Sequence, residues 1–185
     1  MKFVKKSWFK KTTSVILTAS LIGLSAQAVT FAEERNTLTN KEINCLAKNV
    51  YFEAKNQGTG GWLAVAFVTL NRVKDSRFPN TICEVVYQGP TKPSWQDPKR
   101  QIPIRYKCQF SWYCDGKPDI IGSQEKYNNI LVFTNTMLNQ ATSTNMIDIT
   151  DGATHYHADY VKPAWAKTKT KTIEIGDHIF YRWEK

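Results

Sequence analysis

The sequence predicts an α+β domain in which helices come first and a small antiparallel sheet follows. Apolar residues follow a helical pattern over 40–55 and 62–73, and a further helix is expected over 123–139. Toward the C-terminus Ile173 and Ile175 alternate with polar residues, and two faces alternate over 178–183, as they do in strands. With 185 residues, 42% of them hydrophobic, the chain is long enough for one domain with a substantial core.

Residues 1–28 predict a secretory signal peptide. Five lysines precede an apolar run over 14–25, and the sequence Ala-Gln-Ala at 26–28 has the form of a cleavage site. The apolar run is shorter than the roughly 20 residues that a membrane-spanning helix needs. We therefore expect contact with a membrane only transiently, through this segment.

Cleavage is expected near Val29 or Glu33, leaving a short tail over 29–38 and a folded domain over 39–185. The domain is then secreted, to the periplasm or the cell envelope. The full chain has a formal net charge of +9, and removing five lysines and no acid leaves +4. Part of the remaining positive charge lies in one segment, in which Asp97 is the only acidic residue and the basic residues are Lys92, Lys99, Arg100, Arg105 and Lys107. Such a cluster is either a solvated loop or a contact for an anionic polymer.

Four cysteines, Cys45, Cys83, Cys108 and Cys114, can form two disulfides in an exported chain, with three possible connectivities. At least one disulfide is expected. None of the spacings is C-x-x-C, which disfavours a zinc ribbon or a thioredoxin-like site.

The first helices have recognisable boundaries. Thr39 and Glu42 have the spacing of a capping box before the helix expected over 40–55. The glycine-rich segment 58–61 is expected to interrupt this helix. The run 62–73 is apolar almost all round, which predicts a helix buried at the centre of the domain.

Shorter elements are expected next. Thr81 and Glu84 repeat the capping-box spacing and predict a short helix through 85–87. The segment 88–107 contains four prolines and no periodicity, so it is expected to be a long loop of the kind that is often functional.

Glu53 is the strongest candidate for a catalytic acid. It lies at the edge of the apolar stripe of the first helix, where a carboxyl group is partly removed from water. Such an environment raises the pKa of the carboxyl group and suits a general acid. The alternative is a surface glutamate near a helix end.

The three histidines of the chain, His155, His157 and His178, offer a second chemistry. On a strand, His155 and His157 point to one face, and a third histidine could complete a zinc site. The alternative is a set of hydrogen-bonded histidines in a site wall or in the core. Since no H-E-x-x-H spacing is present, we expect no metal and no other cofactor. A P-loop, a G-x-S-x-G motif and a Rossmann fingerprint are also missing from the sequence.

An ordered series of motifs resembles the spore cortex-lytic enzyme / cell wall hydrolase family of bacteria and their phages. The matching segments are CLAKNVYFEAKNQG (45–58), AVAFVTLNRV (64–73), FPNTICEVVYQ (78–88), CQFSWYCDG (108–116), GATHYHADYVKPAWA (152–166) and HIFYR (178–182). The resemblance implies a single lysozyme-like domain that cuts the glycan strands of peptidoglycan. Two departures are Lys55-Asn56, where relatives commonly have Arg-Gly, and the segment 89–107, which is longer than usual.

The resemblance also implies the chemistry. The catalytic glutamate of the family's Y-F-E-A motif corresponds to Glu53, which would act as acid and base in cleaving the MurNAc–GlcNAc β-1,4 bond. The expected enzyme is a monomeric lytic transglycosylase that leaves 1,6-anhydro-MurNAc ends and has no nucleic-acid partner. Motif position alone suggests five groove contacts: Gln109, Ser111, Trp112, Tyr156 and His157.

Three alternatives stay open on the sequence. A hydrolytic muramidase needs a second carboxylate, for which Asp115 is the candidate. An exported zinc enzyme, an amidase or a nuclease, would use His155, His157 and His178. In a non-catalytic peptidoglycan binder or lysozyme inhibitor, Glu53 would be dispensable.

Overall fold

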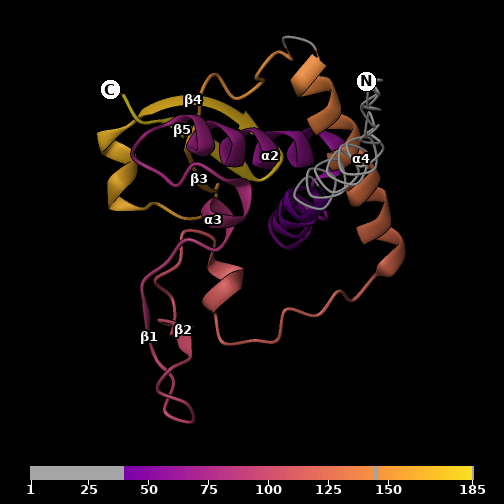
Figure 1. Ribbon diagram of the computed structural model, residues 1–185. Coiled ribbons are helices and arrows are strands. Elements are labelled where there is room, and N and C mark those ends of the chain that lie inside the picture. The colour runs from indigo at the N-terminus through magenta and orange to yellow at the C-terminus, as the bar shows by residue number, and fades with distance from the viewer. Residues whose placement is uncertain (1–39, 144–145, 185) are drawn as a thin grey trace, which may run out of the picture. The chain divides into compact units, whose positions relative to one another are not determined.

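The computed structural model describes residues 40–143 and 146–184. The predicted signal peptide (1–28) and tail (29–38) lie outside these residues. Within them, helices come first and a small antiparallel sheet follows, which confirms the predicted α+β class (Figure 1). None of the helices described is both long enough and apolar enough to cross a membrane.

Two consecutive helices form the centre of the domain. The first covers residues 40–54, and α2 follows as Gly58–Lys74. As predicted, α2 is buried on nearly all sides, with Val65, Ala66 and Val68 inaccessible to solvent. The interruption was predicted at 58–61 but lies at residues 55–57, and the glycines form the first turn of α2. Gly58 has φ +68°, a conformation that glycine adopts without strain, so it turns the chain into α2.

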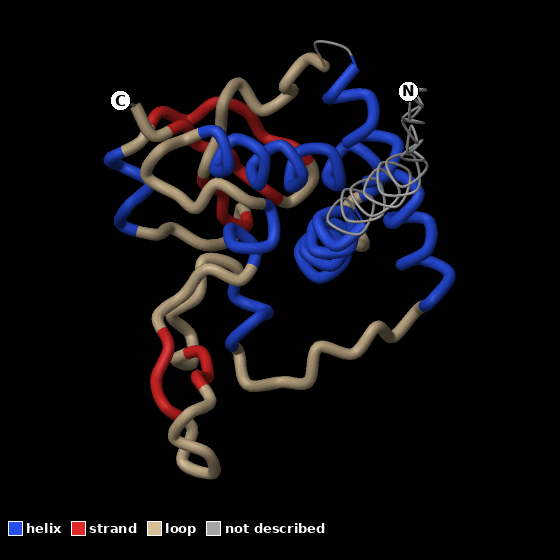
Figure 2. The backbone as a smooth tube through the Cα atoms, in the orientation of Figure 1, coloured by secondary structure: helices blue, strands red, loops and turns tan. Residues whose placement is uncertain are grey.

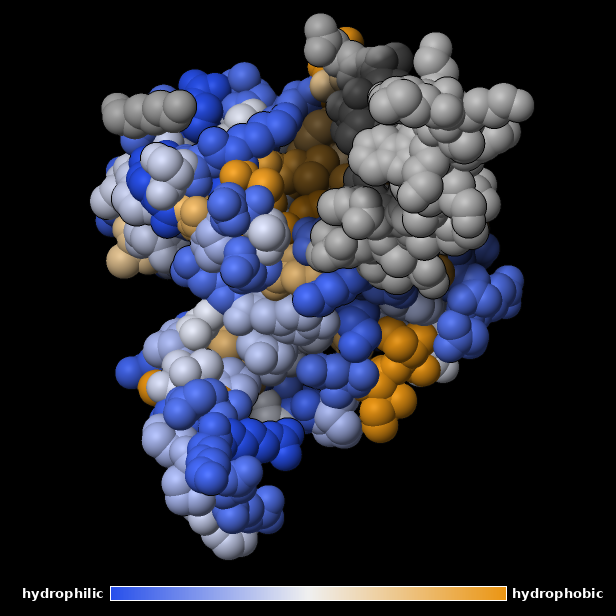
Figure 3. All heavy atoms as spheres, in the orientation of Figure 1, coloured by the Kyte–Doolittle hydropathy of each residue, from blue (hydrophilic) through white to orange (hydrophobic). Residues whose placement is uncertain are grey.

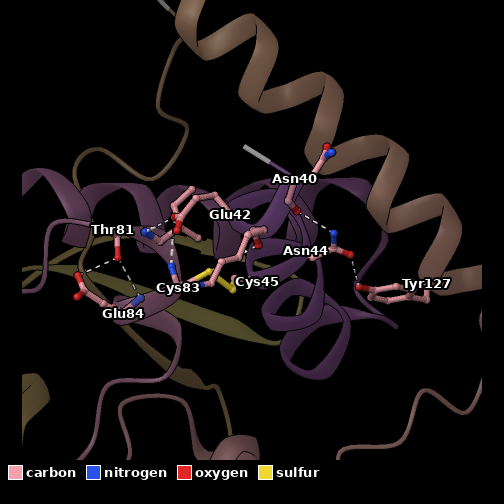
Figure 4. Close-up of a disulfide and its surroundings, with 10 residues drawn as sticks. Asn40, Glu42, Asn44, Cys45, Thr81, Cys83, Glu84 and Tyr127 are labelled. Atoms are coloured by element: carbon pink, nitrogen blue, oxygen red, sulfur yellow. Dashed lines mark hydrogen bonds between the residues drawn. A yellow bond between two sulfur atoms is a disulfide. The ribbon is translucent and has the colours of Figure 1, made fainter. Parts of the chain in front are cut away.

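The short helix α3 (Ile82–Val86) begins with the predicted cap. The Thr81 hydroxyl accepts a hydrogen bond from the Glu84 backbone N–H at 3.2 Å and donates one to the Glu84 carboxylate at 2.8 Å (Figure 4). Both interactions remain within one turn, which explains why spacing alone predicted them.

Glu42 does not close the predicted box within the described residues, because Thr39 lies outside them. Its carboxylate instead accepts the backbone N–H groups of Ile82, at 2.6 Å, and Cys83, at 3.2 Å (Figure 4). The Cys45–Cys83 disulfide lies beside these bonds. The first helix and α3 are therefore joined by one covalent bond and one charge-assisted cap.

The segment predicted as a long loop is a two-stranded hairpin. Strands β1 (Thr91–Pro93) and β2 (Gln101–Pro103) pair antiparallel, with Lys92 opposite Ile102. Both strands are edges, where a proline without an N–H group is tolerated. Residues 89–107, called the arm below, extend away from the helices and the larger sheet (Figures 1 and 2).

The arm leads into η1 (Ser111–Cys114), and a long connection leads from there to α4 (Gln124–Ser143). A second disulfide, Cys108–Cys114, closes the segment before the connection. The prediction of at least one disulfide is thus confirmed, and the described residues include no free cysteine.

The second sheet contains β3 (His155–Ala158), β4 (Thr170–Ile175) and β5 (His178–Arg182), and η2 (Ala164–Thr168) lies between the first two. The strand order is β3-β5-β4, with antiparallel pairing throughout (Figure 2). Phe180, at the centre of β5, packs on Ala64 and Val68 of α2. The sheet is thereby fixed against the central helix.

Candidate functional site

Glu53 lies in the last turn of the first helix, and its side chain is half-buried. The Tyr156 hydroxyl, from β3, donates a hydrogen bond of 2.9 Å to Oε2 of Glu53. Burial raises the pKa of the Glu53 carboxyl group, while the Tyr156 hydrogen bond and the positive charge of Arg72 oppose that rise. The same burial and the Glu53 charge hold the pKa of Tyr156 well above its ordinary value, so this hydroxyl stays protonated and remains a donor.

Arg72 is the cation beside this pair, and sequence reasoning missed it. Its side chain is only 4% exposed, and its Nε donates to the Thr154 carbonyl at 2.7 Å. The guanidinium carbon lies 4.8 Å from the centre of the Phe110 ring and 5.3 Å from that of Phe78. Its Nη1 is buried and has no hydrogen-bond partner among the described residues. Burial lowers the pKa of Arg72 to about 10, so the group stays positive at neutral pH.

One signal in the sequence could have identified Arg72. It is the only charged residue in the predicted run 62–73, which is otherwise apolar almost all round. A charge in a helix buried on all sides requires partners or a function.

Glu53 and Arg72 open into a cavity of about 470 Å³. Four of the five predicted groove contacts line the same cavity, namely Gln109, Ser111, Tyr156 and His157. The other lining residues are Cys108, Ala158, Tyr160, Val161 and His178. The cavity thus combines the first helix, α2, the segment around η1 and the edge of the second sheet.

The structure does not bring Trp112 to this cavity. Its ring is only 7% exposed and stacks on Phe52 at a centroid distance of 4.7 Å. Its indole N–H donates to Oδ1 of Asn49 at 2.9 Å, and Asn49 donates in turn to the Thr69 hydroxyl at 3.1 Å. The structure therefore places Trp112 in the core, against Asn49, which lies one helical turn before Glu53. An aromatic residue beside two exposed groove residues could not be recognised as buried from the motif alone.

Asp115 does not line the Glu53 cavity either. It follows η1, and its carboxylate accepts the backbone N–H of Lys117 at 2.8 Å, as in a turn. Asp159 is not a lining residue of the Glu53 cavity but lines a neighbouring one, which shares His157 and Val161 with it. Among the described lining residues of the Glu53 cavity, Glu53 is the one carboxylate.

The histidines do not converge. His155 and His157 point to one face of the sheet, whereas His178 pairs opposite Ala158 and shares the other face. His155 lies 2.9 Å from the Thr154 hydroxyl, and His157 Nε2 lies 3.0 Å from the Tyr181 hydroxyl. In the part of the chain that the structure describes, no three His, Cys, Asp or Glu side chains are grouped as metal ligands would be. The arrangement gives the zinc alternative no ligand set.

Burial also favours the neutral form of two of these histidines, His155 and His178. It lowers the pKa of His155 to about 3, with help from the nearby cations Arg72, Lys169 and Arg77, and it lowers the pKa of His178. Neither ring is then a proton donor at neutral pH.

A larger cavity, of about 910 Å³, lies beside the Cys45–Cys83 disulfide. Its one carboxylate among the described lining residues, Glu84, is already engaged in capping α3 through Thr81. This cavity is therefore a weaker candidate for acid–base chemistry than the one at Glu53.

Comparison with known proteins relates the chain to enzymes of the bacterial cell wall. A family model described as Cell Wall Hydrolase matches residues 56–181 and so begins three residues after Glu53. The chain is 26% identical over 146 residues to a spore cortex-lytic enzyme of Bacillus cereus, a match that covers 78% of this chain. It is 38% identical over 50 residues to the spore cortex-lytic enzyme of Bacillus subtilis, which covers 27% of this chain and 16% of the relative. The match spans 46% of the Bacillus cereus relative, less than half its length.

Two solved structures share the fold. The catalytic domain of the Bacillus cereus SleB protein aligns with a TM-score of 0.52 and 25% identity, over 76% of this chain and 89% of that domain. The catalytic domain of the germination-specific lytic transglycosylase SleB of Bacillus anthracis gives the same TM-score and identity, over 76% of this chain and 93% of that domain. The predicted lysozyme-like α+β fold is confirmed by these similarities.

Proposed function

The chain belongs to the cell wall hydrolase family, and on this premise we propose that it cleaves peptidoglycan glycan strands as a lytic transglycosylase, with Glu53 as both acid and base. The observation that supports this choice is the single carboxylate of the cavity. Ordinary glycoside hydrolysis uses two carboxylates that flank the bond, one on each side. One carboxylate is enough when the nucleophile is a hydroxyl of the substrate itself.

The hydrogen bond from Tyr156 assigns different tasks to the two oxygens of Glu53. Since Oε2 accepts the Tyr156 hydroxyl, the transferable proton belongs on Oε1. This proton goes to the bridging oxygen between MurNAc and GlcNAc, and the bond from that oxygen to C1 of MurNAc breaks. The C6 hydroxyl of the same MurNAc then forms a bond to C1 and returns its proton to the Glu53 carboxylate. Water is not consumed, and the new end is a 1,6-anhydro-MurNAc.

The surroundings of Glu53 fit both halves of this cycle. Burial favours the protonated form that must be present before cleavage. Once the proton has left, the Tyr156 hydroxyl and the Arg72 charge stabilise the carboxylate. A group that acts first as acid and then as base needs a pKa that favours neither form strongly, and the opposing effects of burial and of Tyr156 and Arg72 act in that direction.

Glu53→Gln tests this proposal directly. The variant keeps the size of the side chain and loses the transferable proton, so cleavage of purified sacculi should fall by about 10²–10⁴-fold or more. Asp115→Asn and Asp159→Asn serve as matched controls, because each neutralises a carboxylate outside the cavity, and both should keep activity. Thermal unfolding should show that all three variants are folded.

Mass spectrometry of the products identifies the reaction. Wild-type digestion should give muropeptides that end in anhydro-MurNAc and are lighter by one water than the hydrolysed forms. Reducing ends combined with a loss of activity in Asp115→Asn would favour the hydrolytic muramidase. Full activity in Glu53→Gln would remove this residue from the mechanism.

The proposal requires the protein to reach the cell envelope, which the predicted signal peptide would provide. Peptidoglycan glycan strands are then its substrate, and no metal is needed for the cycle described. EDTA should therefore leave the rate unchanged, and a loss of activity restored by zinc would contradict the proposal.

A further inference from the structure

The arm carries the net positive charge of the described chain. Residues 40–184 contain eighteen Lys and Arg and fourteen Asp and Glu. The arm holds five of these cations and one of these acids, a net charge of +4, while the rest is balanced at thirteen of each. All five cationic side chains of the arm are exposed. In Figure 3 the projecting arm is coloured mainly as hydrophilic.

Two aromatic rings are presented on the same arm. Trp95, in the turn between β1 and β2, is 85% exposed, and Tyr106, at the base, is 69% exposed. Tyr106 has φ +60°, which is uncommon for a residue with a side chain. Its N–H donates to the Cys114 carbonyl at 2.9 Å, which fixes the backbone in this conformation, and the guanidinium carbon of Arg105 lies 4.8 Å from the ring centre. Large rings kept in solvent beside cations are typical of a binding surface rather than of a passive loop.

The base of the arm is continuous with the wall of the catalytic cavity. Gln109, which lines the cavity, donates its backbone N–H at 2.9 Å to the carbonyl of Gln88, directly before the arm. Gly89 lies so close to Cys108, another lining residue, that an added Cβ would come within 2.9 Å of its Sγ. At the other side of the base, Arg105 donates to the Asp115 carbonyl at 3.0 Å. A polymer that leaves the cavity along this wall meets the arm next.

We propose that the arm is a second binding surface for peptidoglycan, which holds carboxylates of the peptide stems outside the catalytic cavity. This inference rests on the proposed function, since it takes the polymer in the cavity as the arm's partner. The stems supply anionic groups at intervals along the glycan, which match the uncompensated cations of the arm. Trp95 adds an apolar contact that does not depend on charge.

The test measures binding in a Glu53→Gln background, so that the polymer is not cut. The arm variant Lys92→Gln/Lys99→Gln/Arg100→Gln removes three charges, and Lys48→Gln/Lys117→Gln/Lys126→Gln removes three from the body of the domain. Co-sedimentation with purified sacculi at about 0.05 M salt should be about tenfold weaker for the arm variant and change less than about twofold for the control. At about 0.5 M salt the two should bind alike.

Chemical modification of the polymer gives the reciprocal experiment. After the stem carboxylates are converted to neutral amides, the protein with an intact arm should bind as weakly as the arm variant binds unmodified sacculi. Trp95→Ala should weaken binding by about threefold at both salt concentrations, because an apolar contact is not screened. An unchanged melting temperature in all variants would show that the substitutions leave the fold intact.

Several results would overturn the inference. One is equal binding of arm and control variants, and another is arm-dependent binding to vesicles of anionic lipid but not to sacculi. Product chemistry of the wild type separates this inference from the proposed function. If the wild type cuts sacculi while the arm variant binds them normally, the arm inference fails alone. If arm-dependent binding occurs without cleavage, the transglycosylase proposal fails instead.

Discussion

Tyr156→Phe changes one hydroxyl in the catalytic cavity and removes the 2.9 Å hydrogen bond to Oε2 of Glu53. A hydrogen bond to a charged acceptor contributes about 1.5–3 kcal/mol, and one between neutral groups about 0.5–1.5 kcal/mol. The hydroxyl therefore favours the carboxylate over the carboxylic acid by about 1–1.5 kcal/mol. At 1.36 kcal/mol for each pH unit, this difference corresponds to about one pH unit.

The direction of the effect follows from the proposed role of Glu53 as the acid. The acid must be protonated to donate, so activity falls as the pH rises through the Glu53 pKa. Burial raises that pKa, and the Tyr156 hydrogen bond lowers it. Without the hydroxyl the pKa rises further, and the alkaline limb of the pH profile should move upward by about one pH unit.

Initial rates of fragment release from sacculi, measured across the pH range, provide the assay. Tyr181→Phe is the matched control, because its hydroxyl lies 3.0 Å from His157 Nε2 instead of Glu53. Phe at position 156 keeps the packing of that ring against Phe180. An alkaline limb that stays in place in Tyr156→Phe, or moves equally in Tyr181→Phe, would refute the assignment of this hydrogen bond.

Three further predictions concern stability, each measured by urea unfolding. Replacing Cys45 and Cys83 by Ser should lower the free energy of unfolding by about 4 kcal/mol, because this bridge spans 38 residues. Removing the second bridge, which spans 6 residues, should lower it by about 2 kcal/mol. Equal losses would contradict the loop-closure argument. Asn49→Leu should cost about 1–3 kcal/mol, since the buried indole N–H of Trp112 loses its acceptor; an unchanged midpoint would show that water replaces Asn49. Glu53→Gln should leave stability unchanged below the ordinary carboxyl pKa of 4.5, where the wild-type group is protonated in both states. Above that pH it should raise stability, because ionisation of Glu53 is easier in the unfolded wild type than in the folded one. Lower stability of the variant at about pH 8 would contradict this.

The sequence predicted most of the helices and the strands near the C-terminus because their signals are local. The cap at Thr81 and Glu84 needs only neighbours within one turn, and the strand pattern over 178–183 is likewise contained within β5. The arm was missed because its strands are short, contain prolines and bury little, so they leave no alternation. Pairing between Lys92 and Ile102 is visible only in three dimensions.

Among the site residues, too, those with a local signal in the sequence could be predicted, and those placed by distant contacts could not. Glu53 could be found from its place on an apolar stripe, together with the family resemblance. The burial of Trp112 depends on Asn49, 63 residues away, and the role of Arg72 depends on Thr154, 82 residues away. Contacts over such separations leave no periodic trace, so spacing alone could not assign Trp112 to the core or Arg72 to the cavity.

The order of strands in the second sheet makes the position of Tyr156 depend on residues close to the C-terminus. Tyr156 lies on β3, whose described partner is β5, made of residues 178–182. Until the ribosome has added those residues, β3 has no neighbour to pair with, and the hydroxyl that contacts Glu53 is not held in place. A chain interrupted before residue 178 would carry the acid and lack its partner. The geometry around Glu53 therefore depends on residues 178–182, although none of them contributes a side chain to the Glu53–Tyr156 hydrogen bond.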